Sequence, residues 1–333
     1  MVNQISVEDA LKGDYIILDV RAPIEFEEAH IPGAISLPLI DDEQRAIVGT
    51  LYKQVGSGEA YAKGFEFIMP KSKALFDELL KHDKPVVVYC WRGGLRSKIV
   101  TLLGMSGRKD IFQLIGGYKA YRDSVRKSLE DYDLKQKIIV LHGYSCVDKT
   151  KILNALPNSI DLEGLAGHRG SVFGAMGMKP NSQKMFDSLV LDELIKLKDE
   201  SYIVLEGESA KIGNVNIPKF LFDGLKAGTN VLIKMGLEDR MKVFIDEYKI
   251  FDRKEEFIEI LRRLSHRVGK KNVADIEKFL GEGNLVEACK ILFEKYYDPL
   301  YDHTMNKLEY ALEVERDYVV EIKKFLEKIK SSQ

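Results

Sequence analysis

Apolar positions in the first 130 residues alternate between short continuous runs and helically spaced segments. The continuous runs predict β-strands over residues 15–20, 85–90 and 111–117. The three-to-four-residue spacing of apolar side chains predicts helices over residues 73–82, 97–107 and 118–134. Strands that alternate with helices are typical of a parallel sheet with helical crossovers. The sequence therefore predicts an α/β fold for this part of the chain.

A second unit of the same kind follows a charged stretch that ends near residue 135. Residues 137–156 have the pattern of a strand, a glycine-led loop and a helix, and residues 202–209 and 230–236 predict further strands. From about residue 237 to the end the pattern is helical and strongly charged, and we expect no further strand. We predict three parts, over residues 1–134, 135–236 and 237–333.

The composition is that of an ordinary globular chain. Of 333 residues, 45% are hydrophobic and 31% charged, and the formal net charge is −2, so any nucleic-acid binding must come from a local basic patch. Three scattered cysteines exclude a disulfide scaffold and fit a reducing compartment. No run approaches the roughly 18 apolar residues of a membrane span, and no basic start precedes an apolar run at the N-terminus. We expect a cytoplasmic protein without membrane attachment.

The sequence PVVVYCWRGGLRS, residues 85–97, places a cysteine between a buried-looking strand and a loop that opens a helix. Backbone N–H groups and the helix N-terminus make such a loop an anion site. Gly93 and Gly94 allow positive φ angles, and Arg92 and Arg96 add positive charge. These features favour the thiolate of Cys90, which is the nucleophilic form. The alternative is a buried cysteine at a strand end in an arginine-capped turn.

The sequence GYSCVDKT, residues 143–150, resembles the phosphate-binding P-loop, again between a predicted strand and helix. The phosphate-binding candidates here are Gly143, Ser145, Lys149 and Thr150. The sixth position holds Asp148 instead of glycine, which adds a side chain at a demanding backbone position and a negative charge near the anion. We expect weak nucleotide binding. Two alternatives for Asp148 are neutralisation by Lys149 and a bridge through Mg²⁺, which this motif can hold.

Two further segments supply candidate phosphate-binding residues. YIVLEGES places Glu206 and Glu208 at the end of an apolar strand, where P-loop folds direct an acid toward the phosphate site. The alternative is a pair of solvated carboxylates. LEGLAGHRGSVFG, residues 162–174, carries His168 and Arg169 among glycines, and we expect a loop there.

A basic cluster, RRLSHRVGKK, covers residues 262–271. It is either a solvated helix face or a surface that meets the phosphates of a nucleic acid. The candidate RNA contacts are Arg262, Arg263, Arg267, Lys270 and Lys271.

Residues 1–130 resemble the rhodanese family. The segment LDVRAPIEFEEAHIPGAISLPL, residues 18–39, matches that family at Asp19, Arg21, Glu25, His30, Pro32 and Gly33, and GGYKAYR, residues 116–122, resembles its closing segment. The resemblance implies a loop cysteine that carries a persulfide or another chalcogen. The spacing from Cys90 to Arg96 gives a seven-residue loop, which is also found in rhodanese-like phosphatases.

Nearly the whole chain resembles the tRNA 2-selenouridine synthases, in which a rhodanese domain is fused to a P-loop-like domain. CWRGGLRS, DLEGLAGHRGSVFG, VLEGES followed by KIGNVNIP, and GNLVEACKILFEKYYDPLYDH carry this resemblance. It implies conversion of wobble 2-thiouridine in tRNA to 2-selenouridine with selenophosphate, through an S-geranyl intermediate made from geranyl diphosphate. It also implies a partner enzyme that supplies selenophosphate. We expect no tightly bound cofactor.

The resemblance also suggests roles for the candidate residues. Lys149 and Thr150, with His168 or Arg169, would stabilise the departing diphosphate. Cys90 would handle selenium, either as an enzyme-bound perselenide or by holding the displaced group, beside Arg92 and Arg96. Two alternatives remain: a rhodanese-type sulfurtransferase or phosphatase with a regulatory C-terminal half, and a non-catalytic tRNA-binding protein.

Overall fold

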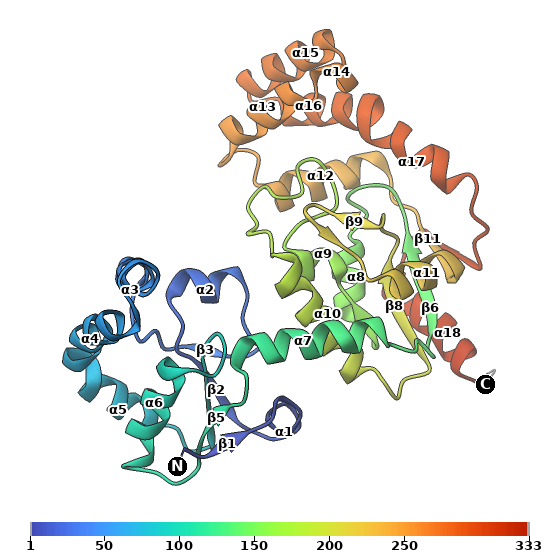
Figure 1. The fold of residues 1–333 in the computed structure, drawn as a ribbon. Coiled ribbons are helices and arrows are strands. Elements are labelled where there is room, and N and C mark those ends of the chain that lie inside the picture. The colour runs from blue at the N-terminus through green and yellow to red at the C-terminus, as the bar shows by residue number, and fades with distance from the viewer. Residues whose placement is uncertain (1, 332–333) are drawn as a thin grey trace. The chain divides into compact units, whose positions relative to one another are not determined.

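A computed structural model describes residues 2–331, with the backbone alone for residues 303 and 304 (Figure 1). Contacts within the chain divide it into two compact units. Unit 1 contains the chain up to Asp131 together with Lys184–Asp192. Unit 2 contains Tyr132–Gln183 and the chain from Glu193 onward. The boundary near residue 236 that the sequence suggests stays a prediction.

Unit 1 is built on a five-stranded sheet in which all neighbouring strands are parallel. In spatial order the strands are β1 (Gln4–Ile5), β5 (Ile111–Leu114), β4 (Val86–Tyr89), β2 (Ile16–Asp19) and β3 (Ile35–Ser36). The central strand β4 is buried along its whole length, as a continuous apolar run in a parallel sheet should be.

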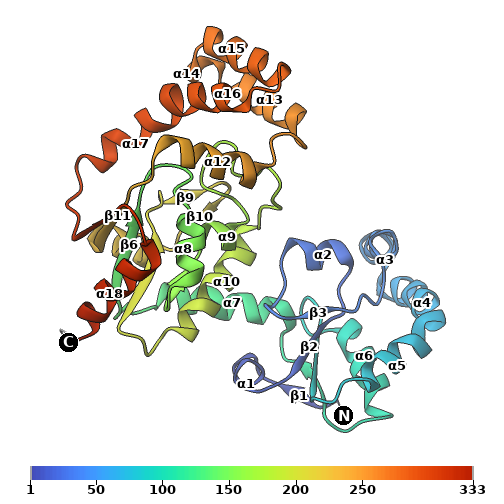
Figure 2. The same ribbon diagram turned by 180° about the vertical axis from the view of Figure 1, so that it is seen from behind.

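Helices cover both faces of this sheet. In both views α1 lies on the opposite side from α5 and α6 (Figures 1 and 2), and α1 contacts α7. The helices of unit 1 are α1 (Val7–Lys12), α2 (Pro23–Glu28), α3 (Asp42–Gln54), α4 (Ser57–Ile68), the 3₁₀ turn η1 (Met69–Lys71), α5 (Ser72–Leu80), α6 (Leu95–Met105) and α7 (Gly117–Glu130). Leu18, Val88, Val100 and Ile111 belong to the core between the sheet and α5 and α6.

Unit 2 contains a second parallel sheet. Its spatial order is β12 (Leu312–Val314), β11 (Thr229–Ile233), β6 (Lys137–His142), β8 (Tyr202–Glu206) and β7 (Ser159–Ile160). A separate antiparallel hairpin is formed by β9 (Lys211–Ile212) and β10 (Val215–Asn216). The first helix after β6 is α8 (Lys149–Ala155), which contacts the C-terminal helix α18 (Tyr318–Ser331). Ile152, Leu153, Ile322 and Leu326 join these helices to the sheet core.

The remaining helices run from the middle of the chain to residue 305. They are α9 (Leu162–Ala166), α10 (Gln183–Lys196), α11 (Lys219–Ala227), α12 (Leu237–Tyr248), α13 (Lys254–Arg263), α14 (Ser265–Val268), α15 (Lys270–Gly281), α16 (Leu285–Leu292), the π-helical turn η2 (Phe293–Tyr297) and α17 (Asp298–Met305).

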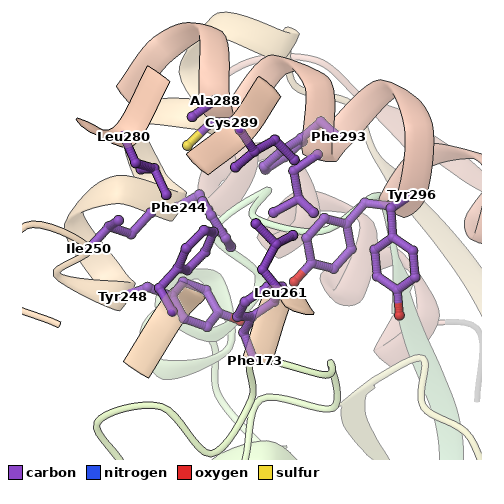
Figure 3. Packing of buried hydrophobic residues seen from close by; sticks show 14 of the residues in the cluster. Phe173, Phe244, Tyr248, Ile250, Leu261, Leu280, Ala288, Cys289, Phe293 and Tyr296 are labelled. Atoms are coloured by element: carbon purple, nitrogen blue, oxygen red, sulfur yellow. The ribbon is translucent and has the colours of Figure 1, made fainter. Parts of the chain in front are cut away.

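An aromatic core holds the helical part of unit 2 together (Figure 3). Phe244 of α12 lies at its centre, with edge-on contacts to Phe173 at 6.3 Å and to Phe293 at 5.4 Å between ring centroids. Cys289 is buried there on α16, as expected of a core cysteine. Since Phe173 comes from the glycine-rich segment, this core fixes the end of a candidate functional loop.

The structure confirms the parallel α/β fold and the strands at 15–20, 85–90, 111–117, 202–209 and 230–236, all of them shorter than predicted and β11 beginning one residue earlier. Two predictions were wrong. The helical C-terminal region does contain a strand, β12, whose three residues pair with β11 at the sheet edge and are too few to show alternation. Residues Leu162–Ala166 form helix α9 instead of a loop, because Asp161 caps the helix by accepting from the Gly164 N–H and the helix ends only at Gly167, where φ is +63°.

Among residues 2–331, no helix is both long enough and apolar enough to cross a bilayer.

Candidate active sites

Cys90 follows β4 and lies at the start of the loop that leads into α6. Its side chain is buried, and its Sγ is 3.2 Å from the Oγ of Ser97 in the first turn of that helix. The thiol also lines a cavity of about 860 Å³, cavity 1, which is bounded by this loop and by side chains of α3 and α4. A ligand in cavity 1 can therefore reach the sulfur.

The turn at the start of α7 fixes the shape of the cysteine loop. The Tyr118 N–H donates to the Cys90 carbonyl at 2.8 Å, and the Lys119 N–H donates to the Trp91 carbonyl at 2.9 Å. Gly93 has φ +63°, and a Cβ there would lie 2.8 Å from the Leu114 carbonyl oxygen. Gly94, in contrast, has φ −90°, so the expectation of a positive φ holds for Gly93 and is wrong for Gly94.

The two arginines of the loop have different surroundings. Arg96 forms an ion pair with Glu25 at 2.7 Å, and Glu25 also lies 3.1 Å from Arg45. Burial opposes ionisation of Glu25, but the hydrogen bond and charge of Arg96 outweigh it and lower the pKa of this carboxyl. Arg92 is exposed and lines cavity 1, without an ion pair among the described residues. Arg92 is thus the loop cation that is available to a ligand.

Asp19 and Arg21 form a buried ion pair behind the loop. Both Nε and Nη2 of Arg21 donate to the Asp19 carboxylate, and Nη2 also donates to the Ala29 carbonyl. The guanidinium lies 4.1 Å from the centroid of the Tyr118 ring. The pair joins the end of β2 to the turn that fixes the cysteine loop, although Arg21 also lines cavity 1.

In unit 2, the P-loop-like segment connects β6 to α8. Gly143 has no room for a side chain, since a Cβ would lie 2.7 Å from the Val147 side chain. Cys146 and Asp148 adopt left-handed φ angles of +62° and +58°, so Asp148 does occupy the demanding backbone position that the motif gives to glycine. Its carboxylate pairs with Lys151 at 2.9 Å and not with Lys149.

The loop is braced by side chains of α12 and α17. Ser145 is buried, and its hydroxyl donates to the Tyr301 hydroxyl oxygen at 3.1 Å. Arg240 donates to the Ser145 carbonyl at 3.0 Å and forms an ion pair with Asp298 at 2.5 Å. These contacts fix both the hydroxyl and the carbonyl group of Ser145.

Lys149 is the first residue of α8, and Thr150, the second, is half-buried. The Lys149 ammonium lies 3.3 Å from the Tyr144 carbonyl oxygen. Burial opposes its charge, but Tyr301, Glu163 and Glu208 outweigh that effect and raise the pKa of Lys149. The ammonium is therefore charged at neutral pH, and it lies at the head of the helix beside the carbonyl groups of the loop.

A group of carboxyls lies near Lys149. Glu206 is buried at the end of β8, and its Oε1 accepts from the Glu163 N–H at 2.8 Å. Burial, with the charge of Asp161 second, raises the pKa of Glu206 to about 8. Burial likewise raises the pKa of Glu208 and, with the charge of Glu208, that of Glu163. Among the described residues, no cluster of three His, Cys, Asp or Glu side chains forms a metal site, and Mg²⁺ stays a prediction from the motif.

The two residues predicted in the glycine-rich segment have different surroundings. His168 lines a cavity of about 1140 Å³, cavity 2, together with Gly143 and Glu208. Burial and the Arg169 charge lower the pKa of His168, so its imidazole is neutral at pH 7. The Arg169 guanidinium donates to the Met176 carbonyl at 2.9 Å and lies 4.9 Å from the Tyr248 ring centroid. Arg169 does not line cavity 2 and instead fixes the segment in place.

Two family models match separate parts of the chain. A model described as the tRNA 2-selenouridine synthase AAA domain matches residues 136–332, and a rhodanese-like domain model matches residues 6–124. The chain belongs to the tRNA 2-selenouridine synthase family. Three similar relatives carry that name. The one from Hydrogenovibrio crunogenus is 32% identical, over 87% of this chain and 89% of its own. The relative from Sulfurovum sp. NBC37-1 is 31% identical, over 87% of this chain and 89% of its own. The relative from Shewanella piezotolerans is 29% identical, over 92% of this chain and 94% of its own.

The basic cluster at residues 262–271 contains cations that form ion pairs and cations that do not. Arg262 pairs with Glu277 at 2.8 Å and Arg263 with Glu259 at 2.5 Å. Arg267, Lys270 and Lys271 are exposed, and no ion pair involves them within the part of the chain that the structure describes. Arg267 also lines cavity 2. The three unpaired cations are the better candidates for RNA contacts.

Three residues near the P-loop were not predicted from the sequence. His142, whose Nε2 lies 2.9 Å from the Asn230 Oδ1, lines cavity 2 and directly precedes the P-loop glycine, so its position was a usable signal. Glu163 lies in the glycine-rich segment, but nothing in its spacing indicates contact with Glu206. Tyr301 reaches Ser145 across 156 positions of the chain, and no local pattern predicts such a contact.

The raised pKa of Glu206 predicts a specific pH dependence of stability. At pH values between 4.5, the ordinary pKa of a glutamate, and about 8, the native Glu206 carboxyl holds a proton that the unfolded chain has released. Its stabilising contribution is therefore complete below pH 4.5 and is lost as the pH rises through 8. The upper limit is about 5 kcal/mol, at about 1.4 kcal/mol per pKa unit over the shift from 4.5 to about 8.

Glu206→Gln, which imitates the protonated acid, should consequently lose less unfolding free energy than the natural chain between pH 5 and pH 9. Denaturant titrations at several pH values measure this difference. The exposed control Glu238→Gln should follow the natural profile. If Glu206→Gln follows it too, the carboxyl is not protonated in the native state.

Proposed function

We propose that this protein converts 2-thiouridine at the wobble position of tRNA into 2-selenouridine, through an S-geranyl intermediate and with selenophosphate as the selenium donor. Membership of the tRNA 2-selenouridine synthase family supports the overall reaction. The observation that carries the two-step proposal is the presence of two loops suited to anions, each beside its own cavity. Of the two loops, only the first has a cysteine that lines its cavity. Cys90 lines cavity 1, whereas Cys146 of the P-loop does not line cavity 2.

The first step is alkylation of the base at the P-loop. The thiocarbonyl sulfur attacks C1 of geranyl diphosphate, the C–O bond breaks, its electron pair leaves with the diphosphate, and the base loses its N3 proton. Alkylation turns a poor leaving group into a good one. Lys149 would balance the developing charge on the diphosphate, and such a step needs no nucleotide hydrolysis.

The lining of cavity 2 supports a substrate with an anionic head and an apolar tail. Gly143 marks its P-loop end, whereas Phe222 and Leu225 of α11 and Leu300 of α17 supply apolar wall. Pockets that combine apolar walls with a few polar groups are typical small-molecule sites. The side chains of Lys211 and Lys226 also line this cavity, which favours an anionic ligand.

The second step takes place at Cys90. Its thiolate attacks C2 of the alkylated base, the C2–S bond breaks, and geranyl thiol leaves with a proton. The selenium of selenophosphate then displaces Cys90 from C2. Water cleaves the Se–P bond, so that phosphate leaves and N3 regains a proton. Arg92 would bind selenophosphate, because it is the unpaired cation of the loop.

A perselenide on Cys90 is the less favourable route. Selenophosphate carries selenium at the oxidation level of selenide, so a sulfur–selenium bond to Cys90 would require a two-electron oxidant. The covalent route above needs only a nucleophile, a leaving group and water. A separate enzyme would supply selenophosphate.

Incubation with 2-thiouridine tRNA, geranyl diphosphate and selenophosphate, followed by nucleoside mass spectrometry, tests the proposal. We expect S-geranyl-2-thiouridine first and 2-selenouridine later. A sulfurtransferase or phosphatase would act without tRNA, and a non-catalytic RNA-binding protein would leave the base unchanged.

Cys90→Ser should reduce 2-selenouridine formation by at least about a hundredfold, since an alcohol is a far weaker nucleophile than a thiolate at neutral pH. The same variant should still form S-geranyl-2-thiouridine and bind tRNA normally, and an unchanged thermal melt is the control for the folding of unit 1. Normal selenium incorporation in this variant would exclude Cys90 as the residue that performs the second step.

Lys149→Ala should slow geranylation by about 100- to 1000-fold, the usual cost of losing one group that stabilises transition-state charge. When the variant is given a tRNA that already carries S-geranyl-2-thiouridine, the defect should disappear. Lys290→Ala, which removes an exposed lysine on α16 away from the P-loop, is the control and should geranylate normally. If Lys149→Ala geranylates normally and fails only with selenophosphate, the assignment of steps to loops is wrong.

Binding of tRNA should weaken with salt, because phosphate contacts release counterions. Charge reversal at Arg267, Lys270 and Lys271 together should lower the logarithmic salt slope by about 2 and reduce affinity, without changing which base is modified. Filter binding at several salt concentrations measures this. Reversal of the exposed Lys323, Lys324 and Lys330 on α18 is the control, and an unchanged slope in the first variant would place the RNA surface elsewhere.

A further inference from the structure

Helix α3 carries apolar side chains that the core of unit 1 does not use. None of its 13 residues is buried. Ile47 remains 45% exposed and Tyr52 58% exposed. Its main neighbour is α4, which itself leaves Tyr61 and Phe65 largely exposed. A helix pair that leaves this much apolar surface in water is costly unless a ligand or partner uses it.

This apolar surface faces the cysteine loop across cavity 1. Val48 and Tyr52 of α3 and Tyr61 and Phe65 of α4 line one side of the cavity, and Cys90 lies on the other. The volume of about 860 Å³ falls within the range of roughly 300–1,000 Å³ that drug-sized ligands occupy. Selenophosphate or a lone sulfur atom would need only a small part of this space.

The charges of the cavity indicate which end of a ligand lies at the thiol. Arg45 and Arg96 share the single carboxylate of Glu25, whereas Arg92 beside the thiol has an exposed guanidinium with no carboxylate partner among the described residues. The polar and anionic end of a ligand therefore belongs beside Arg92 and Cys90. Its apolar end belongs against α3 and α4.

We propose that cavity 1 is the subsite for the alkylated base in the second step, with the geranyl chain held against α3 and α4. This inference rests on the proposed function and deepens it by naming a residue set that selects the substrate. The bond between C2 and the geranylthio group must lie close to the sulfur of Cys90 when that bond breaks. A wall that binds the ten-carbon chain positions C2 over the thiol and distinguishes the alkylated base from unreacted 2-thiouridine.

Binding can be measured without any turnover, because Trp91 is the single tryptophan of the chain and lines cavity 1. Its fluorescence reports directly on this cavity. The S-geranyl-2-thiouridine nucleoside should shift the emission and bind at least tenfold more tightly than the S-methyl nucleoside, since each buried methylene contributes about a fourfold factor. Equal affinity of the two nucleosides, or an unchanged Trp91 emission, would overturn the inference.

A matched pair of variants tests the wall in the reaction. Val48→Asp places a charge in the cavity, whereas Ile47→Asp changes the adjacent residue of α3, which does not line it. With selenophosphate and tRNA that carries S-geranyl-2-thiouridine, Val48→Asp should lower kcat/KM at least tenfold and Ile47→Asp should not. With S-methyl-2-thiouridine tRNA, Val48→Asp should lower kcat/KM by a clearly smaller factor than with the geranylated tRNA, and Ile47→Asp should match the natural chain. Phe65→Ala is the milder second variant if Val48→Asp unfolds.

The outcomes separate this inference from the function on which it rests. If the natural chain converts neither tRNA, the proposed second step is wrong. If it converts both, and Val48→Asp and Phe65→Ala slow the two substrates equally or not at all, the second step stands and the geranyl subsite is not cavity 1.

Discussion

The strands of both sheets are parallel, and the central ones are buried on both faces, so polar chemistry is confined to the edge where their carboxyl ends meet. Cys90 follows β4, the P-loop follows β6, and Glu206 ends β8. A carboxylate such as that of Glu206 would not be tolerated one or two positions earlier in such a strand. The position of both candidate sites is therefore a consequence of how a parallel sheet buries its strands.

The two loops meet the same requirement for a tight turn in different ways. The cysteine loop uses Gly93 at its positive φ angle and packs that glycine against the Leu114 carbonyl. The P-loop instead places Cys146 and Asp148 in left-handed conformations, which cost about 1 kcal/mol or more each for residues with a Cβ. The braces from Arg240 and Tyr301 explain how such a loop persists, because they fix Ser145 from both its carbonyl and its hydroxyl.

Local patterns determine what could be predicted from the sequence. The strands, the helices that follow them and the loops between them were predictable because apolar runs, glycines and charged residues are read within ten or so positions. The ion pair of Arg96 with Glu25 spans 71 positions, and the neutralisation of that arginine was not predictable. The same limit applies to β12, since its three residues become a strand only by pairing with β11.

The electrostatics of the two sites are suited to different anions. At the cysteine loop the guanidinium of Arg92 is exposed, whereas that of Arg96 pairs with Glu25, which it shares with Arg45. At the P-loop the charged Lys149 lies among carboxyls whose pKa values burial has raised. Because Glu206 is largely protonated at neutral pH, it adds little repulsion toward a multiply charged anion, whereas an ionised carboxylate about 4 Å from such an anion would cost roughly 4 kcal/mol per unit charge at an effective dielectric of about 20. Burial of these acids thus permits a lysine-centred anion site to exist beside three glutamates.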